Sequence, residues 1–163
     1  MKKTNNKGFS LVELIIVIAI MAILIGVLAP QYIKYVEKSR VSADKDLIDS
    51  VYNALTTAYG DPDVTTGLPA ANTYGLSSLS ASASNNADFN YLVMETLGQG
   101  TSGNGASVEA KLKSKIGKSS GSGHITYSVD GNGNFTVYAG NTGDTGTAAS
   151  KDVTFIAVGA GAQ

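Results

Sequence analysis

An uninterrupted apolar segment near the N-terminus limits the possible folds of this chain more than any other feature. It runs for 21 residues, from Phe9 to Ala29, and Glu13 is its only charged residue. At ~1.5 Å of rise per residue, a helix of this length spans about 31 Å, which is enough to cross the hydrocarbon layer of a bilayer. The segment therefore predicts a membrane-spanning helix.

Three lysines, Lys2, Lys3 and Lys7, precede the apolar segment. Because basic flanks of membrane helices stay in the cytoplasm, we expect the N-terminus inside and the residues after Pro30 outside. A secretory signal peptide fits less well. Its apolar core has roughly 7–15 residues and ends at a small-residue cleavage site, whereas here the core is longer and is followed directly by Pro30.

The residues from Lys7 to Leu14, Lys-Gly-Phe-Ser-Leu-Val-Glu-Leu, closely resemble the N-terminal signature of type IV prepilins and pseudopilins. That signature is a short basic leader ending in Gly, then Phe, then an apolar helix with Glu at its fifth residue. Counted from Phe9, Glu13 is the fifth residue. The resemblance implies that a prepilin peptidase cuts between Gly8 and Phe9 and methylates the new amine of Phe9, while the apolar helix is kept.

Glu13 needs a partner, because an acid at the centre of a membrane helix costs ~2.5–3.5 kcal/mol. Cleavage would create an amine on Phe9 with an ordinary pKa of about 7.7–8.0, and residues four apart share one helix face. The helix dipole also favours an anion in the first turn. The resemblance implies an amine on a neighbouring subunit as the partner, which sets axial register during assembly. The alternative is a Glu13 that merely snorkels to the headgroups.

Gly26 and Pro30 mark a weak point in the helix. Pro30 has no N–H to donate to the carbonyl of Gly26, and glycine is itself a poor helix former. The simpler interpretation is a kink in a continuous helix. The resemblance, in which a Pro at the twenty-second mature residue recurs, favours a segment that melts to extended chain when subunits pack into a filament.

Residues 31–59 predict an amphipathic helix that continues the apolar one, giving a helix of ~75 Å if unbroken. Apolar residues follow steps of three and four best from Leu47 to Tyr59, while Asp44 interrupts the pattern, and Gly60 and the residues after it end the helix. We expect the second half of this helix to be the spine on which a sheet packs.

The remaining chain predicts a small α+β head. Residues 60–88 are expected to form a linker or long loop, and two short helices are expected at Asp88–Leu97 and Ser107–Ile116. Alternating residues predict about three antiparallel strands at 125–129, 135–139 and 153–158, the first two joined by a hairpin loop at 130–134. This sheet would pack on the apolar face of the spine helix.

Other patterns do not support catalysis or a cofactor. The Gly-x-Gly-x-x-Gly at 98–103 follows a predicted helix instead of a strand, so it is interpreted as a loop. The chain has no cysteine, and His124 is its only histidine, which excludes zinc and nucleophilic-triad arguments. Asp130-x-Asn132-x-Asn134 imitates the start of a calcium loop, but Phe135 replaces the required Gly, so only a weak calcium possibility remains.

The charge balance predicts no general affinity for nucleic acid, because the chain has 12 Lys and Arg residues against 13 Asp and Glu residues. We predict a cleaved leader at 1–8, a membrane or filament-core helix at 9–30, a spine helix at 31–59 and a globular head at 60–163. The predicted function is a non-enzymatic subunit of a type IV pilus, with a homo-oligomeric filament, the membrane, prepilin peptidase and the pilus assembly machinery as partners. Its precursor would cross the membrane once, and its mature form would be extracellular.

Two alternatives remain open. A pseudopilin of a type II secretion or competence machine shares the same N-terminus, although the large loops rich in Gly, Ser and Thr favour a surface filament. A single-pass anchored binding domain is the other alternative, and it predicts no cleavage after Gly8. Adhesion, twitching motility and DNA uptake are uses of a filament among which the sequence does not choose.

Overall fold

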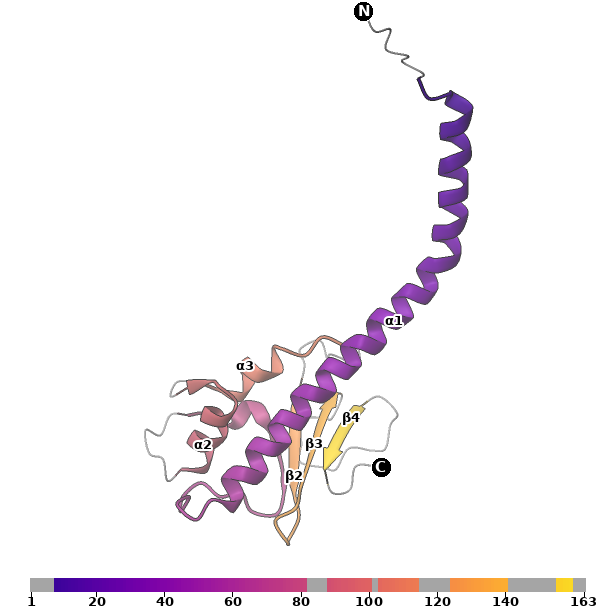
Figure 1. Ribbon diagram of the computed structural model, residues 1–163. Helices are drawn as coiled ribbons and strands as arrows, with labels where there is room; N and C mark the ends of the chain where they lie inside the picture. The colour runs from indigo at the N-terminus through magenta and orange to yellow at the C-terminus, as the bar shows by residue number, and fades with distance from the viewer. Residues whose placement is uncertain (1–7, 82–87, 101–102, 115–123, 141–154, 160–163) are drawn as a thin grey trace, which may run out of the picture. The chain divides into compact units, whose positions relative to one another are not determined.

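The computed structural model describes residues 8–81, 88–100, 103–114, 124–140 and 155–159 (Figure 1). Contacts divide the chain into two compact units, Met1–Lys38 and Ser39–Gln163, and the long first helix belongs to both. The elements in chain order are α1 (Leu11–Gly60), β1 (Thr73–Gly75), η1 (Leu76–Ser78), α2 (Phe89–Thr96), α3 (Gly105–Glu109), β2 (Ile125–Val129), β3 (Phe135–Gly140) and β4 (Phe155–Gly159).

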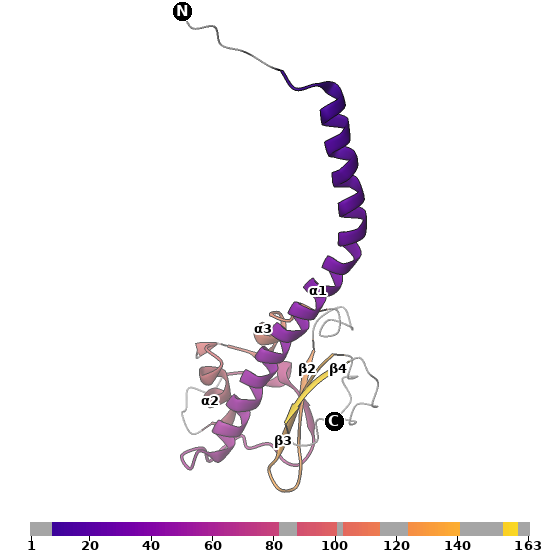
Figure 2. The same cartoon turned by 45° about the vertical axis from the view of Figure 1, so that its right-hand side comes forward.

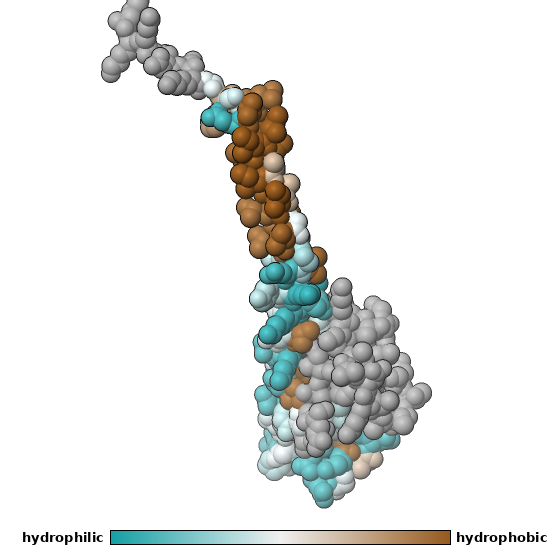
Figure 3. Space-filling view, turned by 90° about the vertical axis from the view of Figure 1, so that its right-hand side faces the viewer, coloured by the Kyte–Doolittle hydropathy of each residue, from teal (hydrophilic) through white to brown (hydrophobic). Residues whose placement is uncertain are grey.

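The first unit contains the apolar half of α1. Every described residue of α1 up to Tyr35 is exposed, and Figure 3 shows the apolar part of this stretch as a hydrophobic surface with hydrophilic residues at its start and after it. The helix passes through Gly26 and Pro30 without interruption. The basic leader with Lys2, Lys3 and Lys7 lies outside the described residues.

In the second unit, the C-terminal half of α1 packs across the sheet (Figures 1 and 2). The helix buries one face, as its spacing predicts, and ends at Gly60, where Asp61 shapes the following turn. Five apolar residues on this face have no exposed surface: Ile48, Val51, Ala54, Leu55 and Ala58. The expected spine helix is therefore confirmed.

The sheet is antiparallel throughout, with the order β1-β2-β3-β4. Ile125 pairs with Ala139, and Val129 pairs with Phe135 across the expected hairpin. The α+β class is confirmed, but the sheet has four strands, whereas about three were expected. The additional strand, β1, comes from the segment predicted as a loop, and it forms because Tyr74 pairs with Tyr127 and stacks on its ring at 5.4 Å.

The prediction of a linker or long loop over residues 60–88 is wrong for the part from Thr73 to Ala81, which contains β1 and η1 and contributes to the core. Leu76, Leu79 and Ala81 are buried, although they stand singly among small polar residues. The backbone N–H of Ala81 donates to Gly103, and that of Gly105 donates to Leu79. This segment is therefore held against the core by long-range hydrogen bonds, which no local pattern reveals.

The two short helices differ in how well the sequence predicts them. α2 is confirmed, with Asp88 accepting hydrogen bonds from the first backbone N–H groups of the helix. α3 begins earlier than expected, capped by Asn104, and ends at Glu109. The prediction that it reaches Ile116 fails, because the N–H groups of residues 113 and 114 instead donate to a side chain on α1. Ile116 itself lies outside the described residues.

Candidate processing and assembly segment

The residues at the predicted cleavage point lie just before α1. Gly8, Phe9 and Ser10 are exposed and precede the first helical residue, Leu11, and the Phe9 side chain is 92% exposed. A peptide bond outside regular structure has no helical hydrogen bonds to break before a peptidase can reach it. The geometry around Gly8 and Phe9 is thus compatible with proteolysis in the uncut chain.

Glu13 lies in the first turn of α1, as predicted, but its contact is one that sequence reasoning missed. Its Oε2 accepts a hydrogen bond of 2.9 Å from the backbone N–H of Ser10. Ser10 and Glu13 have the spacing of a capping box, in which an acid three residues on satisfies the N–H of the capping residue. The Ser-x-x-Glu pattern in the sequence could have predicted this contact. In the uncut chain Glu13 therefore caps its own helix, while Phe9 lies outside it.

The apolar half of α1 meets the requirements of a membrane span. The helix is long and apolar enough to cross a membrane, and its apolar part is fully exposed. Its apolar side chains include Ile15, Ile18 and Ile25, each more than half exposed. Such a surface is stable only in lipid or against other apolar helices, because each large apolar side chain left in water forfeits ~1.5–3 kcal/mol. A membrane and a bundle of identical helices satisfy the same surface.

Gly26 and Pro30 are both helical and exposed in this structure. No atom lies within 4 Å of the position that a side chain at Gly26 would take. The packing of a single subunit therefore does not require glycine there, and the residue lowers helix stability by about 1 kcal/mol relative to alanine. The helix is continuous here, so the kink and the melting in a filament both remain predictions.

In the second unit, Asp44 forms a connection that the sequence analysis recorded only as a break in the pattern. It is 1% exposed, and its two carboxylate oxygens accept hydrogen bonds from the backbone N–H groups of Lys113 (2.7 Å) and Ser114 (2.8 Å). A carboxylate that is buried away from water needs hydrogen-bond donors of this kind, because burying an unpartnered charge is costly. Asp44 thus fixes the segment after α3 to α1. No local sequence pattern indicates this role, because the hydrogen-bond partners of Asp44 are about 70 residues away in the chain.

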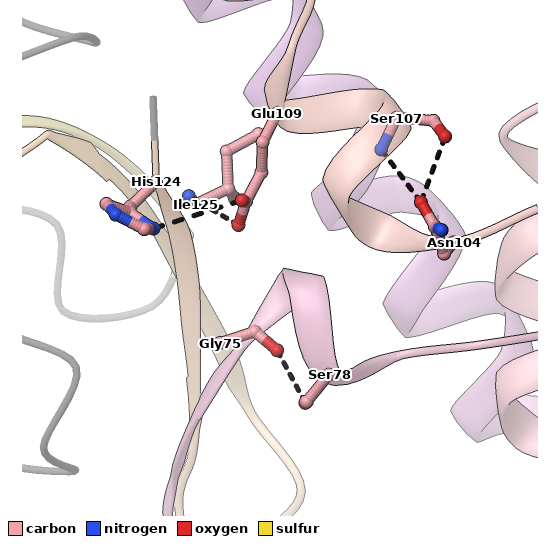
Figure 4. A network of polar contacts seen from close by, with 7 residues as sticks. All are labelled: Gly75, Ser78, Asn104, Ser107, Glu109, His124 and Ile125. Atoms are coloured by element: carbon pink, nitrogen blue, oxygen red, sulfur yellow. Dashed lines mark hydrogen bonds and ion pairs between the residues drawn. The ribbon is translucent and has the colours of Figure 1, made fainter. Parts of the chain in front are cut away.

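A second buried acid joins α3 to the sheet (Figure 4). Glu109 accepts a hydrogen bond of 3.0 Å from the backbone N–H of Ile125, and its other oxygen lies 3.9 Å from Nδ1 of His124. His124 is 30% exposed and directly precedes β2. Glu109 therefore fixes the start of the first long strand through the Ile125 N–H, a role that sequence reasoning did not assign.

Asp130 shapes the β2–β3 hairpin. Its carboxylate accepts hydrogen bonds from the side chain of Asn134 and from the backbone N–H groups of Asn134 and Asn132. The Asn134 contacts hold the pKa of Asp130 below its usual range. These bonds explain the Asp-x-Asn-x-Asn spacing as that of a hairpin turn, the interpretation that the sequence favoured over a calcium-binding loop. Among the described residues, no three His, Cys, Asp or Glu side chains form a group that could hold a metal ion.

Comparison with known proteins identifies relatives of the N-terminal segment. A family model described as "Prokaryotic N-terminal methylation motif" matches residues 3–29. The chain is 36% identical over 59 residues to "Type IV major pilin protein PilA" of Myxococcus xanthus (strain DK1622), covering 36% of this chain and 27% of that protein. It is 41% identical over 64 residues to "Fimbrial protein EcpC" of Eikenella corrodens, covering 39% of this chain and 42% of that protein. The chain thus spans less than half the length of both relatives.

One longer match extends into the head. The chain is 33% identical over 128 residues to "Type IV major fimbrial protein FimA" of Dichelobacter nodosus, an alignment that covers 64% of this chain and 76% of that protein. No solved structure matches the chain. A prepilin-type N-terminus, an exposed apolar helix and a head that aligns with a fimbrial protein lead to one conclusion. The chain belongs to the type IV pilin family.

Proposed function

We propose that this protein is a structural subunit of a type IV pilus filament. It is made as a single-pass membrane precursor and has no enzymatic role. The observation that carries the proposal is the fully exposed apolar half of α1, joined to an independently packed α+β head in a member of the pilin family. A surface of this kind needs a bilayer before assembly and other apolar helices afterwards.

Processing is the first step of the proposed function. The leader lysines keep the N-terminus in the cytoplasm, which places the Gly8–Phe9 bond at the cytoplasmic face. A prepilin peptidase cuts this bond and methylates the amine of Phe9. Both residues are exposed before the start of α1 in the uncut chain, which supports their accessibility.

Assembly then moves the apolar helix from lipid into a bundle of identical helices. Inside such a bundle, Glu13 would be an unpaired charge in an apolar environment unless a cation answers it. The amine of Phe9 on a neighbouring subunit is that cation. Glu13 exchanges the Ser10 N–H for this partner, so only the register that aligns Glu13 with an amine is stable.

The Gly26–Pro30 segment is proposed to melt during assembly. One backbone hydrogen bond is already missing there, and glycine adds its own entropic advantage to the extended state. Extended chain is longer than helix per residue, so melting lets the head shift along the filament axis without moving the helix before Gly26.

Intact mass and N-terminal sequencing of the sheared surface fraction and the membrane fraction test this function. An abundant chain in the sheared fraction that starts at methylated Phe9 is expected. The mature chain confined to membranes would instead indicate a pseudopilin or minor subunit. An uncut Met1 terminus in the membrane fraction would contradict the proposal and leave an anchored domain.

A Gly8 variant is the matched control for this experiment. Gly8→Val is expected to leave the uncut precursor in the membrane, because a bulky side chain next to the bond blocks the peptidase. Mature filaments recovered from this variant would show that the cleavage site is elsewhere.

A further inference from the structure

A groove on the head lies between α1 and the segment that follows α3. It has a volume of about 430 Å³ and is open to solvent. Its accessible apolar lining comes from Ala43 and Leu47 on α1 and from Ala110, whereas Leu112 is fully buried and offers no surface of its own. The exposed side chains of Lys111 and Lys113 stand on either side of Leu112 in the sequence. The groove thus combines an apolar floor with two cationic groups.

Asp44 also lines the groove, but its carboxylate is already hydrogen-bonded within the chain. Both of its oxygens accept backbone hydrogen bonds from residues 113 and 114, and the side chain is 1% exposed. A ligand in the groove therefore meets the lysine ammonium groups before it meets the carboxylate. The electrostatic character of the groove edge is positive, and an anionic partner with an apolar centre fits it.

An anionic segment with an apolar centre directly follows the C-terminus of α1. Asp61-Pro62-Asp63 follows the last residue of α1, and Pro62 and Asp63 are exposed. Its two acids are two residues apart, as the two lysines at the groove are, so the charges of the two segments are complementary in sign and spacing. The turn is held in shape, because Asp61 accepts hydrogen bonds from the backbone N–H groups of Asp63 (2.9 Å) and Val64 (3.2 Å). A preformed turn loses little entropy on binding.

We infer that the Lys111–Lys113 groove of one subunit binds the Asp61–Asp63 turn of a second copy of this chain. The two surfaces of one chain cannot meet, because Asp44 and Gly60 lie roughly 24 Å apart along α1 at about 1.5 Å per residue. A contact between two different surfaces of the same chain is head-to-tail, and such contacts propagate into open helical assemblies when they do not close into a ring. This inference rests on the proposed filament and assigns a contact between heads to it.

Cysteine crosslinking tests this contact in cells that assemble the full-length chain. The natural sequence has no cysteine, so the introduced thiols have no native competitors. In an Asp63→Cys/Lys113→Cys double variant, every subunit carries one thiol in the acidic turn and one thiol at the groove. A thiol-specific oxidant is therefore expected to yield a ladder of dimers, trimers and higher species. Each single variant is expected to yield no species beyond dimers.

The control places one thiol outside the groove. Lys45 is exposed on α1 next to Asp44, so Asp63→Cys/Lys45→Cys is expected to give no ladder. Normal filaments of the Asp63→Cys/Lys113→Cys variant without a ladder would overturn the inference and leave the filament function intact. Absence of the wild-type chain from sheared filaments would overturn the proposed function. In that case, a ladder of crosslinked species in the membrane fraction would still support the contact between heads, and its absence there would overturn the contact as well.

Charge exchange provides a second test that needs no crosslink. Lys113→Glu and Asp63→Lys are each expected to lower the amount of sheared filament about tenfold, because like charges then face each other. The two changes together are expected to restore it, while Lys45→Glu has no such effect. The mature chain in the membrane fraction reports that each variant folds and is processed. Equal losses in the single and combined variants would contradict the pairing.

Discussion

At the scale of single residues, Glu13 has one observed contact and one proposed role, which a substitution series separates. In the uncut chain it caps α1 through the N–H of Ser10. In the proposed filament its charge answers the amine of Phe9 on a neighbour. The first role needs only an oxygen atom, whereas the second needs a negative charge.

Glu13→Ala and Glu13→Gln should therefore both leave membrane insertion and cleavage largely intact and both lower filament yield. A charge-assisted hydrogen bond is worth about 1.5–3 kcal/mol, so a loss of roughly tenfold or more is expected. The amount of mature chain in the sheared fraction measures it. Normal yield from Glu13→Ala would remove the register role, and normal yield from Glu13→Gln alone would assign the defect to the cap.

Asp44 is a residue whose importance lies in the head. Asp44→Ala should lower the free energy of unfolding, because two buried N–H groups lose their acceptors at a cost of roughly 1–3 kcal/mol each. Thermal unfolding of the purified full chain in detergent, followed by circular dichroism, measures the change. Asp46→Ala is the matched control, because Asp46 is exposed on the same helix and should alter stability by less than about 0.5 kcal/mol. Equal stability of the two variants would contradict the role of Asp44.

At the scale of elements, close packing between η1 and α3 depends on Gly105. A Cβ at this position would collide with the backbone carbonyl oxygen of Leu76. Gly105→Ala should therefore destabilise the head by about 1–3 kcal/mol, as overpacked cores do. Gly131→Ala provides the comparison, because no atom lies within 4 Å of its added Cβ. Denaturant unfolding of both variants that gave equal midpoints would refute this contact.

The Gly26–Pro30 segment belongs to the same scale. A Gly26→Ala/Pro30→Ala variant regains a helical hydrogen bond and a better helix former, so the helix resists melting by several kcal/mol more. Membrane insertion and cleavage should be unchanged, while filament yield should fall. Wild-type yield from this variant would show that melting is not needed for assembly.

The sequence predicted the elements whose signals are local. The membrane-length helix, the spine face from Leu47 onward, the Asp88 cap and the β2–β3 hairpin all follow from spacing within a few residues. The β1 strand escaped prediction because three residues cannot show alternation, and Tyr74 becomes part of the sheet only by pairing with Tyr127. Asp44 escaped for the same reason, since its donors come from a distant segment.

The core of the head shows how aromatic residues from separate elements join it. The Phe135 ring lies 5.3 Å from that of Tyr59, edge to face, and 6.4 Å from that of Phe89. Burial raises the pKa of the Tyr127 phenol, and Tyr74 beside it adds to the rise, so this phenol stays neutral within the core. Helix α1, α2 and the sheet therefore share one apolar centre, which pattern alone predicts only in outline.

At the scale of the whole molecule, two chemically different parts have two different requirements. The apolar half of α1 has an exposed surface that only lipid or other helices can cover. The head has its own buried core and presents the groove and the acidic turn. The proposed filament would satisfy both parts at once, with the helices bundled together and the heads in contact.

Helical reconstruction by electron cryomicroscopy of filaments sheared from cells that produce this chain tests the central claim most directly. We predict a core of bundled α1 helices that begin at Phe9, with each Glu13 beside the Phe9 amine of a neighbour and extended density at residues 26–30. Filaments that lack this chain, or that contain it with residues 1–8 still attached, would contradict the account.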